Sequence, residues 1–128
     1  MRLMTLLVSP VVLAAALATG CASMPAPAPA KTADGVLVGA NGMTLYTFDK
    51  DVAGSGKSVC NGPCATNWPP LMAADSDQPQ GNFTVITRDD GKKQWAQKGK
   101  PLYFWAKDAK PGDKTGDGFN KIWQVARP

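Results

Sequence analysis

The chain has 128 residues and a formal net charge of +4, with 13 Gly, 11 Pro and no His, and its 10 acidic residues are all Asp. A chain without Glu that is rich in Gly and Pro lacks the usual material of exposed helices, which argues against a helical protein. Its lysines are scattered among aspartates rather than gathered in one stripe, so the charge does not indicate a nucleic-acid partner.

Residues 1–20 have the layout of a bacterial export signal, with a short basic start and an apolar run that is short for a membrane span. "LATGC" then places small residues before Cys21, as in a lipobox, where a peptidase exposes the Cys amine and the thiol is lipidated. The Leu that usually stands three positions before the Cys is Ala18 here. We predict a lipidated Cys21; signal cleavage nearby, for example after Ala22, is the alternative and would leave a secreted protein without an anchor.

Residues 22–33, "ASMPAPAPAKTA", are predicted to be a tether after Cys21, because alternating Ala-Pro favours extended polyproline II and cannot pack a core. The folded domain is then residues 34–128, enough for one small core. Two or more acyl chains on Cys21 would anchor the protein stably to a membrane. Because Ala22 is not Asp, we expect delivery to the outer membrane of a two-membrane bacterium, facing the periplasm.

The pattern of the domain predicts short strands joined by turns. Residues 35–48 and 82–97 each contain two β-like runs around a dipeptide that tolerates positive φ. A further turn and strand are expected within 98–105, and a last strand within 119–126. One helical turn fits before Pro69. The turn dipeptides are Asn41-Gly42 and Asp90-Gly91, and the expected inward-facing residues are Phe83, Val85, Thr87, Phe119, Trp123 and Val125.

A segment of the first half, "GMTLYTFDKD", returns in the second half as "GKPLYFWAKD". Each carries Tyr-x4-Asp, with Tyr46 and Asp51 in the first and Tyr103 and Asp108 in the second. The Asp falls where the strand has turned, and an Asp there readily accepts bonds from backbone N–H groups. We interpret the motif as structural, with the Tyr packed and its hydroxyl held by a nearby polar group, so that each repeat buries the other's apolar face. A paired Tyr/Asp recognition surface is the alternative.

"CNGPC" places Cys60 and Cys64 around a Gly-Pro turn in a chain predicted to be exported, where thiols are oxidised. With Cys21 lipidated the remaining number of cysteines is even, and we predict a Cys60–Cys64 disulfide. The spacing is not that of thioredoxin, although a redox-active pair stays open. A Cu(I) site made from the reduced cysteines with Met43 or Met72 is a further alternative, since soft ligands suit that ion.

Other patterns in the sequence carry little chemistry. "GSGKS" at 54–58 lacks the first Gly of a phosphate-binding loop, and "GDKTGDG" at 112–118 lacks the EF-hand spacing, so both are interpreted as loops. Without His or Glu, acid–base catalysis would fall to Asp, Lys or Tyr, and no grouping of them suggests an activated nucleophile. We expect neither an enzyme nor a bound cofactor.

Together these residues resemble a family of bacterial predicted lipoproteins and secreted proteins built on a Tyr-x4-Asp repeat. The resemblance rests on both motifs, on "CNGPCATNWPPL" and on the Gly-rich turn before Trp123, and it covers the domain from Gly35 onward. The family is generally described as of unknown function. Its lipobox usage agrees with Cys21.

The fold that we predict is a small, mostly antiparallel β domain of two related repeats with one short helical turn and one disulfide. For function, the leading hypothesis is a cell-envelope lipoprotein that binds a partner or contributes to surface organisation without catalysis. The alternative is a periplasmic copper or electron-transfer accessory that uses Cys60, Cys64 and a Met.

Overall fold

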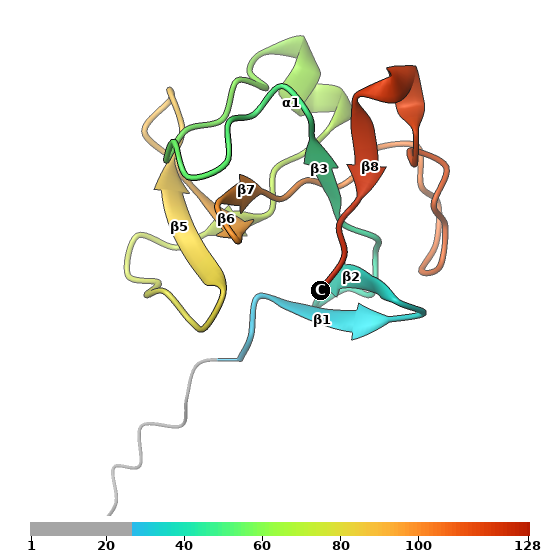
Figure 1. Cartoon of the computed structure of the whole chain (residues 1–128), viewed down its shortest axis with the longest axis horizontal. Helices are drawn as coiled ribbons and strands as arrows, with labels where there is room; N and C mark the ends of the chain where they lie inside the picture. The colour runs from blue at the N-terminus through green and yellow to red at the C-terminus, as the bar shows by residue number, and fades with distance from the viewer. Residues whose placement is uncertain (1–26) are drawn as a thin grey trace, which may run out of the picture.

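The computed structural model describes residues 27–128, so the predicted export signal and Cys21 lie outside the described range. Within that range the chain forms short antiparallel strands and one short α-helix, which is the fold class that the sequence predicted. No helix between residues 27 and 128 is long and apolar enough to cross a membrane. The elements in Figure 1 are β1 (Ala30–Ala33), β2 (Val36–Gly39), β3 (Tyr46–Phe48), α1 (Pro63–Asn67), β4 (Met72–Ala73), β5 (Phe83–Thr87), β6 (Lys93–Gln97), β7 (Lys100–Pro101), the 3₁₀ turn η1 (Phe119–Lys121) and β8 (Trp123–Val125).

Glycine turns join the strands of each repeat. Asp90-Gly91 lies in the turn between β5 and β6, as predicted, and the Arg88 N–H donates to Lys92 O across it at 2.8 Å. The Asn41-Gly42 turn brings Thr44 back beside Val38. Two further turns have only two residues, with positive φ at both, as a tight hairpin requires. They are Asp34-Gly35, between β1 and β2, and Lys98-Gly99, between β6 and β7. The sequence predicted a turn at the second of them but not at the first.

The folded domain begins before the predicted boundary at Asp34. Residues 30–33, assigned by the sequence to the tether, form β1 and pair along their length with β2. The last Pro of the tether is Pro29, so each of residues 30–33 has a backbone N–H that a β-ladder can use. Ala30 is also small enough to be buried, at 6% exposure, among the leucines of the core.

Two of the expected inward-facing sets are only partly correct. In β5 the buried side chain is Ile86, which lies opposite the fully buried Gln94 of β6, whereas Thr87 is exposed and Phe83 is only half buried. Val85 is also half buried, and Thr84 is exposed, so neither face of β5 is buried along its whole length. Near the C-terminus Trp123 and Val125 are buried, as expected, but Phe119 is 38% exposed.

The two repeats are related by an approximate two-fold arrangement centred on their tyrosines. The Tyr46 N–H donates to Tyr103 O at 2.8 Å, and the Tyr103 N–H donates to Tyr46 O at 3.0 Å. After each motif the chain crosses to the other repeat. Thus β8, which follows the second motif, pairs with β3 of the first, and residues 67–70, which follow the first motif, pair with residues 103–106 of the second. The repeats are therefore interlocked rather than merely stacked.

Burial follows the same symmetry. One core cluster lies between the repeats and contains both motif tyrosines together with most of the tryptophans. A smaller cluster contains Leu45 and Leu102, the residue before each motif tyrosine. The larger cluster consists of Val36, Val38, Tyr46, Phe48, Cys60, Trp68, Tyr103, Trp105, Trp123 and Val125.

Candidate functional site

Each motif tyrosine donates its hydroxyl to the aspartate of the other repeat. Tyr46 Oη lies 2.6 Å from Asp108 Oδ2, and Tyr103 Oη lies 2.5 Å from Asp51 Oδ2. Both tyrosine side chains are 0% exposed, and the aspartates are 3% and 8% exposed for Asp51 and Asp108. The sequence predicted a nearby polar partner for each hydroxyl but did not identify this exchange between the repeats.

The aspartates also hold the loops that follow the motifs. Asp51 Oδ1 accepts the Val59 N–H at 2.8 Å, and Asp108 Oδ1 accepts the Thr115 N–H at 3.0 Å and its hydroxyl at 2.6 Å. A carboxylate that accepts from both a phenol and a backbone amide satisfies groups that would be costly to bury alone. The motif thus locks one loop and one opposite tyrosine with a single side chain, which is a structural use.

Burial raises the pKa of both tyrosines well above the usual range, and the hydrogen bond to the opposite aspartate raises it further. Burial also raises the pKa of Asp51, against the opposing effect of the hydrogen bonds that its carboxylate accepts from Tyr103 and the Val59 N–H. A phenolate in this position would face a carboxylate in a site from which water is excluded. The tyrosines are therefore held as neutral donors.

We expect neither tyrosine to ionise near pH 10 in the folded protein. The chain has 2 Tyr, so phenolate absorbance in the near ultraviolet reports these two side chains alone. A raised folded-state pKa means that the stabilisation is fully present below the unfolded-state value of about 10 and is lost as the pH rises above it. The phenolate signal should therefore appear only as the protein unfolds at higher pH, whereas the same chain in guanidinium chloride should titrate near about 10. A folded tyrosine that titrates at its ordinary pKa would contradict the buried pairing.

Four aromatic rings stack in sequence through the centre of the molecule. Phe48 packs on Trp123 at 4.1 Å between ring centroids, Trp123 on Trp68 at 3.8 Å, and Trp68 on Trp105 at 4.0 Å. The two central rings, Trp68 and Trp123, are nearly parallel, with 3° between their planes, and each also receives the edge of one motif tyrosine. Both repeats contribute to the stack, so its integrity depends on how they dock.

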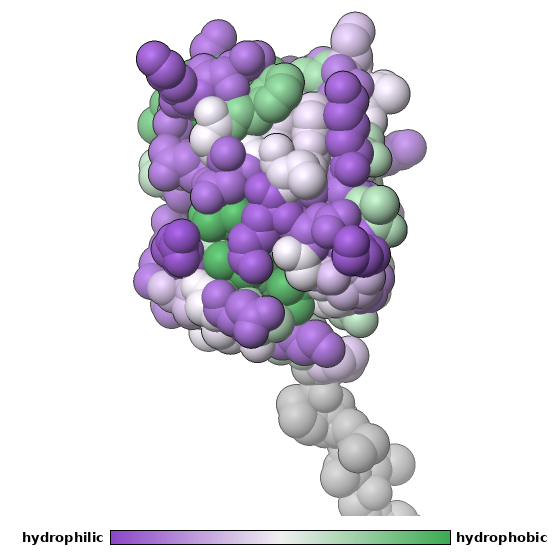
Figure 2. All heavy atoms as spheres, turned by 90° about the vertical axis from the view of Figure 1, so that its right-hand side faces the viewer, coloured by the Kyte–Doolittle hydropathy of each residue, from purple (hydrophilic) through white to green (hydrophobic). Residues whose placement is uncertain are grey.

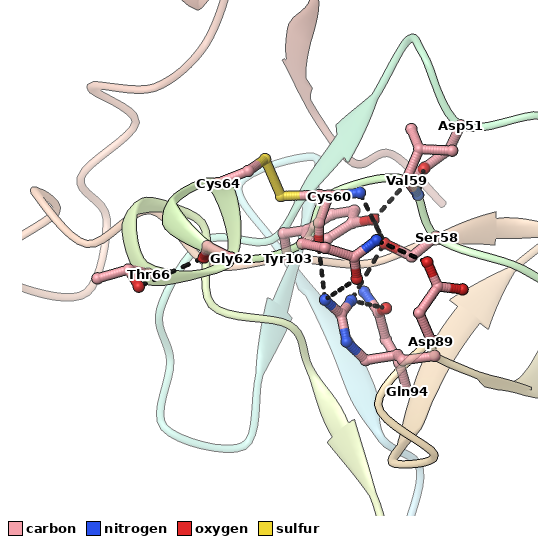
Figure 3. Close-up of a disulfide and its surroundings, with 12 residues drawn as sticks. Asp51, Ser58, Val59, Cys60, Gly62, Cys64, Thr66, Asp89, Gln94 and Tyr103 are labelled. Atoms are coloured by element: carbon pink, nitrogen blue, oxygen red, sulfur yellow. Dashed lines mark hydrogen bonds between the residues drawn. A yellow bond between two sulfur atoms is a disulfide. The ribbon is translucent and has the colours of Figure 1, made fainter.

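Cys60 and Cys64 form a disulfide, as predicted, with an S–S distance of 2.07 Å and a Cα–Cα distance of 5.2 Å (Figure 3). Cys60 is fully buried in the core, and Cys64 lies in the first turn of α1. In this oxidised form neither sulfur is a thiolate. The alternative copper site needs both thiolates, so it stays a prediction for the reduced protein, with Met43 in the turn after β2 and Met72 on β4, 45% exposed.

A polar network beside the disulfide was missed by the sequence analysis. The guanidinium of Arg88 donates to Gln94 Oε1 at 2.7 Å, to Ser58 Oγ at 3.1 Å and to Cys60 O at 2.5 Å. Tyr103 gives its proton to Asp51, so Ser58 must donate to Tyr103 Oη, 2.6 Å away (Figure 3). The sequence feature that could have indicated this network is Arg88 itself, an arginine at the end of a predicted strand in a chain rich in lysine. Arginine suits buried positions where it makes several hydrogen bonds.

The two candidate loops have structural roles. In residues 54–58 the Gly54 N–H donates to Gly99 O, and a Cβ on Gly99 would lie 2.5 Å from Gly54 N, so only glycine fits there. In residues 112–118 the Asp113 carboxylate accepts the backbone N–H groups of Ala109 and Lys110. Among residues 27–128 no three Cys or Asp side chains gather as metal ligands would.

The hollows on the surface of the described residues include two pockets of similar size. The β1–β2 pocket, of about 300 Å³, lies between the first hairpin and the loop after the second motif. Figure 2 views the side of the molecule on which the β1–β2 turn lies and shows hydrophobic residues set back between hydrophilic ones. The β4–β6 pocket, of about 310 Å³, is bounded by Pro27, Leu71, Met72, Gln80 and Trp95. The lining of the β1–β2 pocket includes Lys31, Asp34, Val36, Val38, Thr44 and Lys114.

A family model described as a secreted repeat of unknown function matches the chain twice, over residues 28–72 and 84–127. Each match contains one Tyr-x4-Asp motif, and the first begins just before β1. No curated protein and no solved structure gives a match.

Proposed function

Because the chain belongs to the family of secreted repeats of unknown function, we propose that it is a lipid-anchored, non-catalytic binding module of the bacterial cell envelope. The binding role rests on one observation, that the motif side chains are used inside the fold while a separate pocket is open to solvent. The polar groups of the repeat motif face inward and satisfy one another, whereas the β1–β2 pocket has an apolar floor and opens to solvent. The polar groups of the repeated motif hold the fold together, and the pocket is where a ligand has room.

The burial of the chemically capable side chains supports a role without catalysis. Ser58 is 2% exposed and Asp51 is 3% exposed, and both are committed to hydrogen bonds inside the domain. A general base or a nucleophile must come within hydrogen-bond reach of its substrate. Neither group can do so while the two repeats remain docked.

The sequence before the domain supports anchoring. Cys21 follows small residues at the end of an apolar run, and only residues 22–29 separate it from β1. Eight residues that favour polyproline II, at about 3.1 Å each, span roughly 25 Å, so the anchor would hold the domain close to the lipid surface. Because Ala22 is not Asp, the proposed destination is the outer membrane.

Membrane fractionation of a Cys21→Ser variant tests the anchor. The wild-type protein should be found in the outer-membrane pellet, because its acyl chains stabilise the membrane-bound state, and the variant should be released or remain unprocessed. Ala22→Asp is the matched variant, since it keeps the acylated Cys and should move the protein to the inner membrane without releasing it. Wild-type protein found free in the soluble periplasmic fraction would end the proposal of an anchor.

A further inference from the structure

The β1–β2 pocket lies at a position where the two repeats differ. Matching backbone bonds align the copies: the Leu45 N–H donates to Leu37 O as the Leu102 N–H donates to Trp95 O, which makes Gln94 the counterpart of Val36. In the loops that follow the motifs, Val59 and Thr115 each donate an N–H to a motif aspartate. The residues just before these two, Ser58 and Lys114, are therefore counterparts as well.

In the second repeat this position is occupied by the protein itself. The Arg88 guanidinium bridges Gln94 and Ser58, which are 0% and 2% exposed. Figure 3 shows Gln94 and Ser58 converging beside Tyr103 and the disulfide. Arg88 reaches this place from the wider turn between β5 and β6.

In the first repeat the corresponding turn cannot supply such a side chain. Asp34-Gly35 is a two-residue turn, and β1 places Ala33 opposite Val36. Val36 and Val38, which are 2% and 3% exposed, form an apolar floor in place of an amide. In the second repeat the Arg88 side chain thus fills this position. In the first repeat the position is a pocket of about 300 Å³, at the small end of the range for small-molecule sites.

The charges around the pocket define the ligand. Lys31 and the half-buried Lys114 line it together with a single carboxylate, Asp34, so its surroundings carry a net positive charge. The Thr44 hydroxyl cannot donate to a ligand carboxylate, because its proton goes to Asp113 O at 2.6 Å. We propose that the β1–β2 pocket binds a small carboxylic acid, with its apolar body on Val36 and Val38 and its carboxylate between Lys31 and Lys114. This inference rests on the proposed binding role and gives it a ligand class.

The test uses the mature chain in phospholipid nanodiscs, with empty nanodiscs as the reference. The probe is phenylpropanoate, and the methyl chemical shifts of Val36 and Val38 report binding. We expect saturable shifts with the carboxylate, and roughly three- to tenfold weaker binding of the uncharged phenylpropanamide, because partly exposed lysines contribute modestly. Lys114→Gln should reduce the preference for the carboxylate over the amide.

A pair of variants on β1 separates pocket binding from binding elsewhere. Ala33 is exposed and lines the pocket, so the ring in Ala33→Phe should fill the pocket from its open side, cover Val36 and Val38, and prevent the probe from binding. Thr32→Phe is the matched control, since alternate residues of a strand face opposite sides and Thr32 does not line the pocket. It should bind like the wild-type chain.

Three results would overturn the inference: equal binding by Ala33→Phe and the wild-type chain, shifts confined to Trp95 and Leu71 of the β4–β6 pocket, or amide binding as tight as carboxylate binding. Absence of shifts with both probes would overturn it too. Fractionation of the Cys21→Ser variant tests the lipid anchor separately. If the wild-type protein is anchored but binds neither probe, the proposed ligand class is wrong and the proposed anchor is unaffected.

Discussion

Replacing either motif tyrosine by alanine is expected to lower the free energy of unfolding by roughly 3–5 kcal/mol, the range for a buried aromatic side chain. Tyr46 and Tyr103 are both 0% exposed, and each ring meets a tryptophan edge-on, at 5.3 Å from Trp68 and 5.2 Å from Trp123. The alanine variants also leave a buried aspartate without its phenol donor. Denaturant unfolding followed by tryptophan fluorescence measures the loss.

Phenylalanine variants separate packing from hydrogen bonding at the same positions. Tyr103→Phe keeps the ring but removes the donor to Asp51 and the oxygen that accepts from Ser58, and we expect about 1–3 kcal/mol for these unsatisfied buried groups. The Tyr46→Phe variant should behave alike, because the arrangement is reciprocal. Unfolding close to wild type in both alanine variants would instead favour the interpretation of the motif as a recognition surface.

Trp68→Ala is expected to be as damaging, again by roughly 3–5 kcal/mol. The Trp68 ring is 3% exposed and lies between Trp105 and Trp123, so its loss opens a cavity in the middle of the four-ring stack. It comes from the segment that crosses from the first repeat to the second, and its removal should loosen the docking of the two. Because stacked aromatic pairs add to plain burial, neighbouring rings are not expected to compensate fully.

Phe119→Ala is the control for the tryptophan prediction. Phe119 also touches the stack, at 4.9 Å from Trp105, but it is 38% exposed and lies at the margin. A substitution there should cost about 1 kcal/mol or less. If Trp68→Ala and Phe119→Ala lower the free energy of unfolding equally, the four-ring stack contributes no more to stability than a ring at its edge.

The local features of the fold could be predicted from the sequence because they depend on neighbouring residues. The turn at Asp90-Gly91 forms where it was predicted because Gly91 takes a positive φ there, and the Gly-Pro turn of "CNGPC" brings two sulfurs within bonding reach. The start of the folded domain was predicted too late in the chain, because residues 30–33 form a strand by pairing with residues 36–39. A propensity for polyproline II in the preceding residues carries no information about that partner.

The sequence by itself determined that there are two copies of one unit, that the copies are β-rich, and that they belong with the secreted repeats. Only the tertiary structure decided that each tyrosine bonds to the aspartate of the other copy, 62 residues away for Tyr46 and Asp108. It also decided that Arg88 occupies the position in the second repeat that corresponds to the open β1–β2 pocket of the first. The physical reason is that the spacing of a motif specifies only the geometry within one repeat. The hydrogen bonds between the repeats depend on how their two surfaces dock. That docking is selected by burial and hydrogen bonding across the whole core.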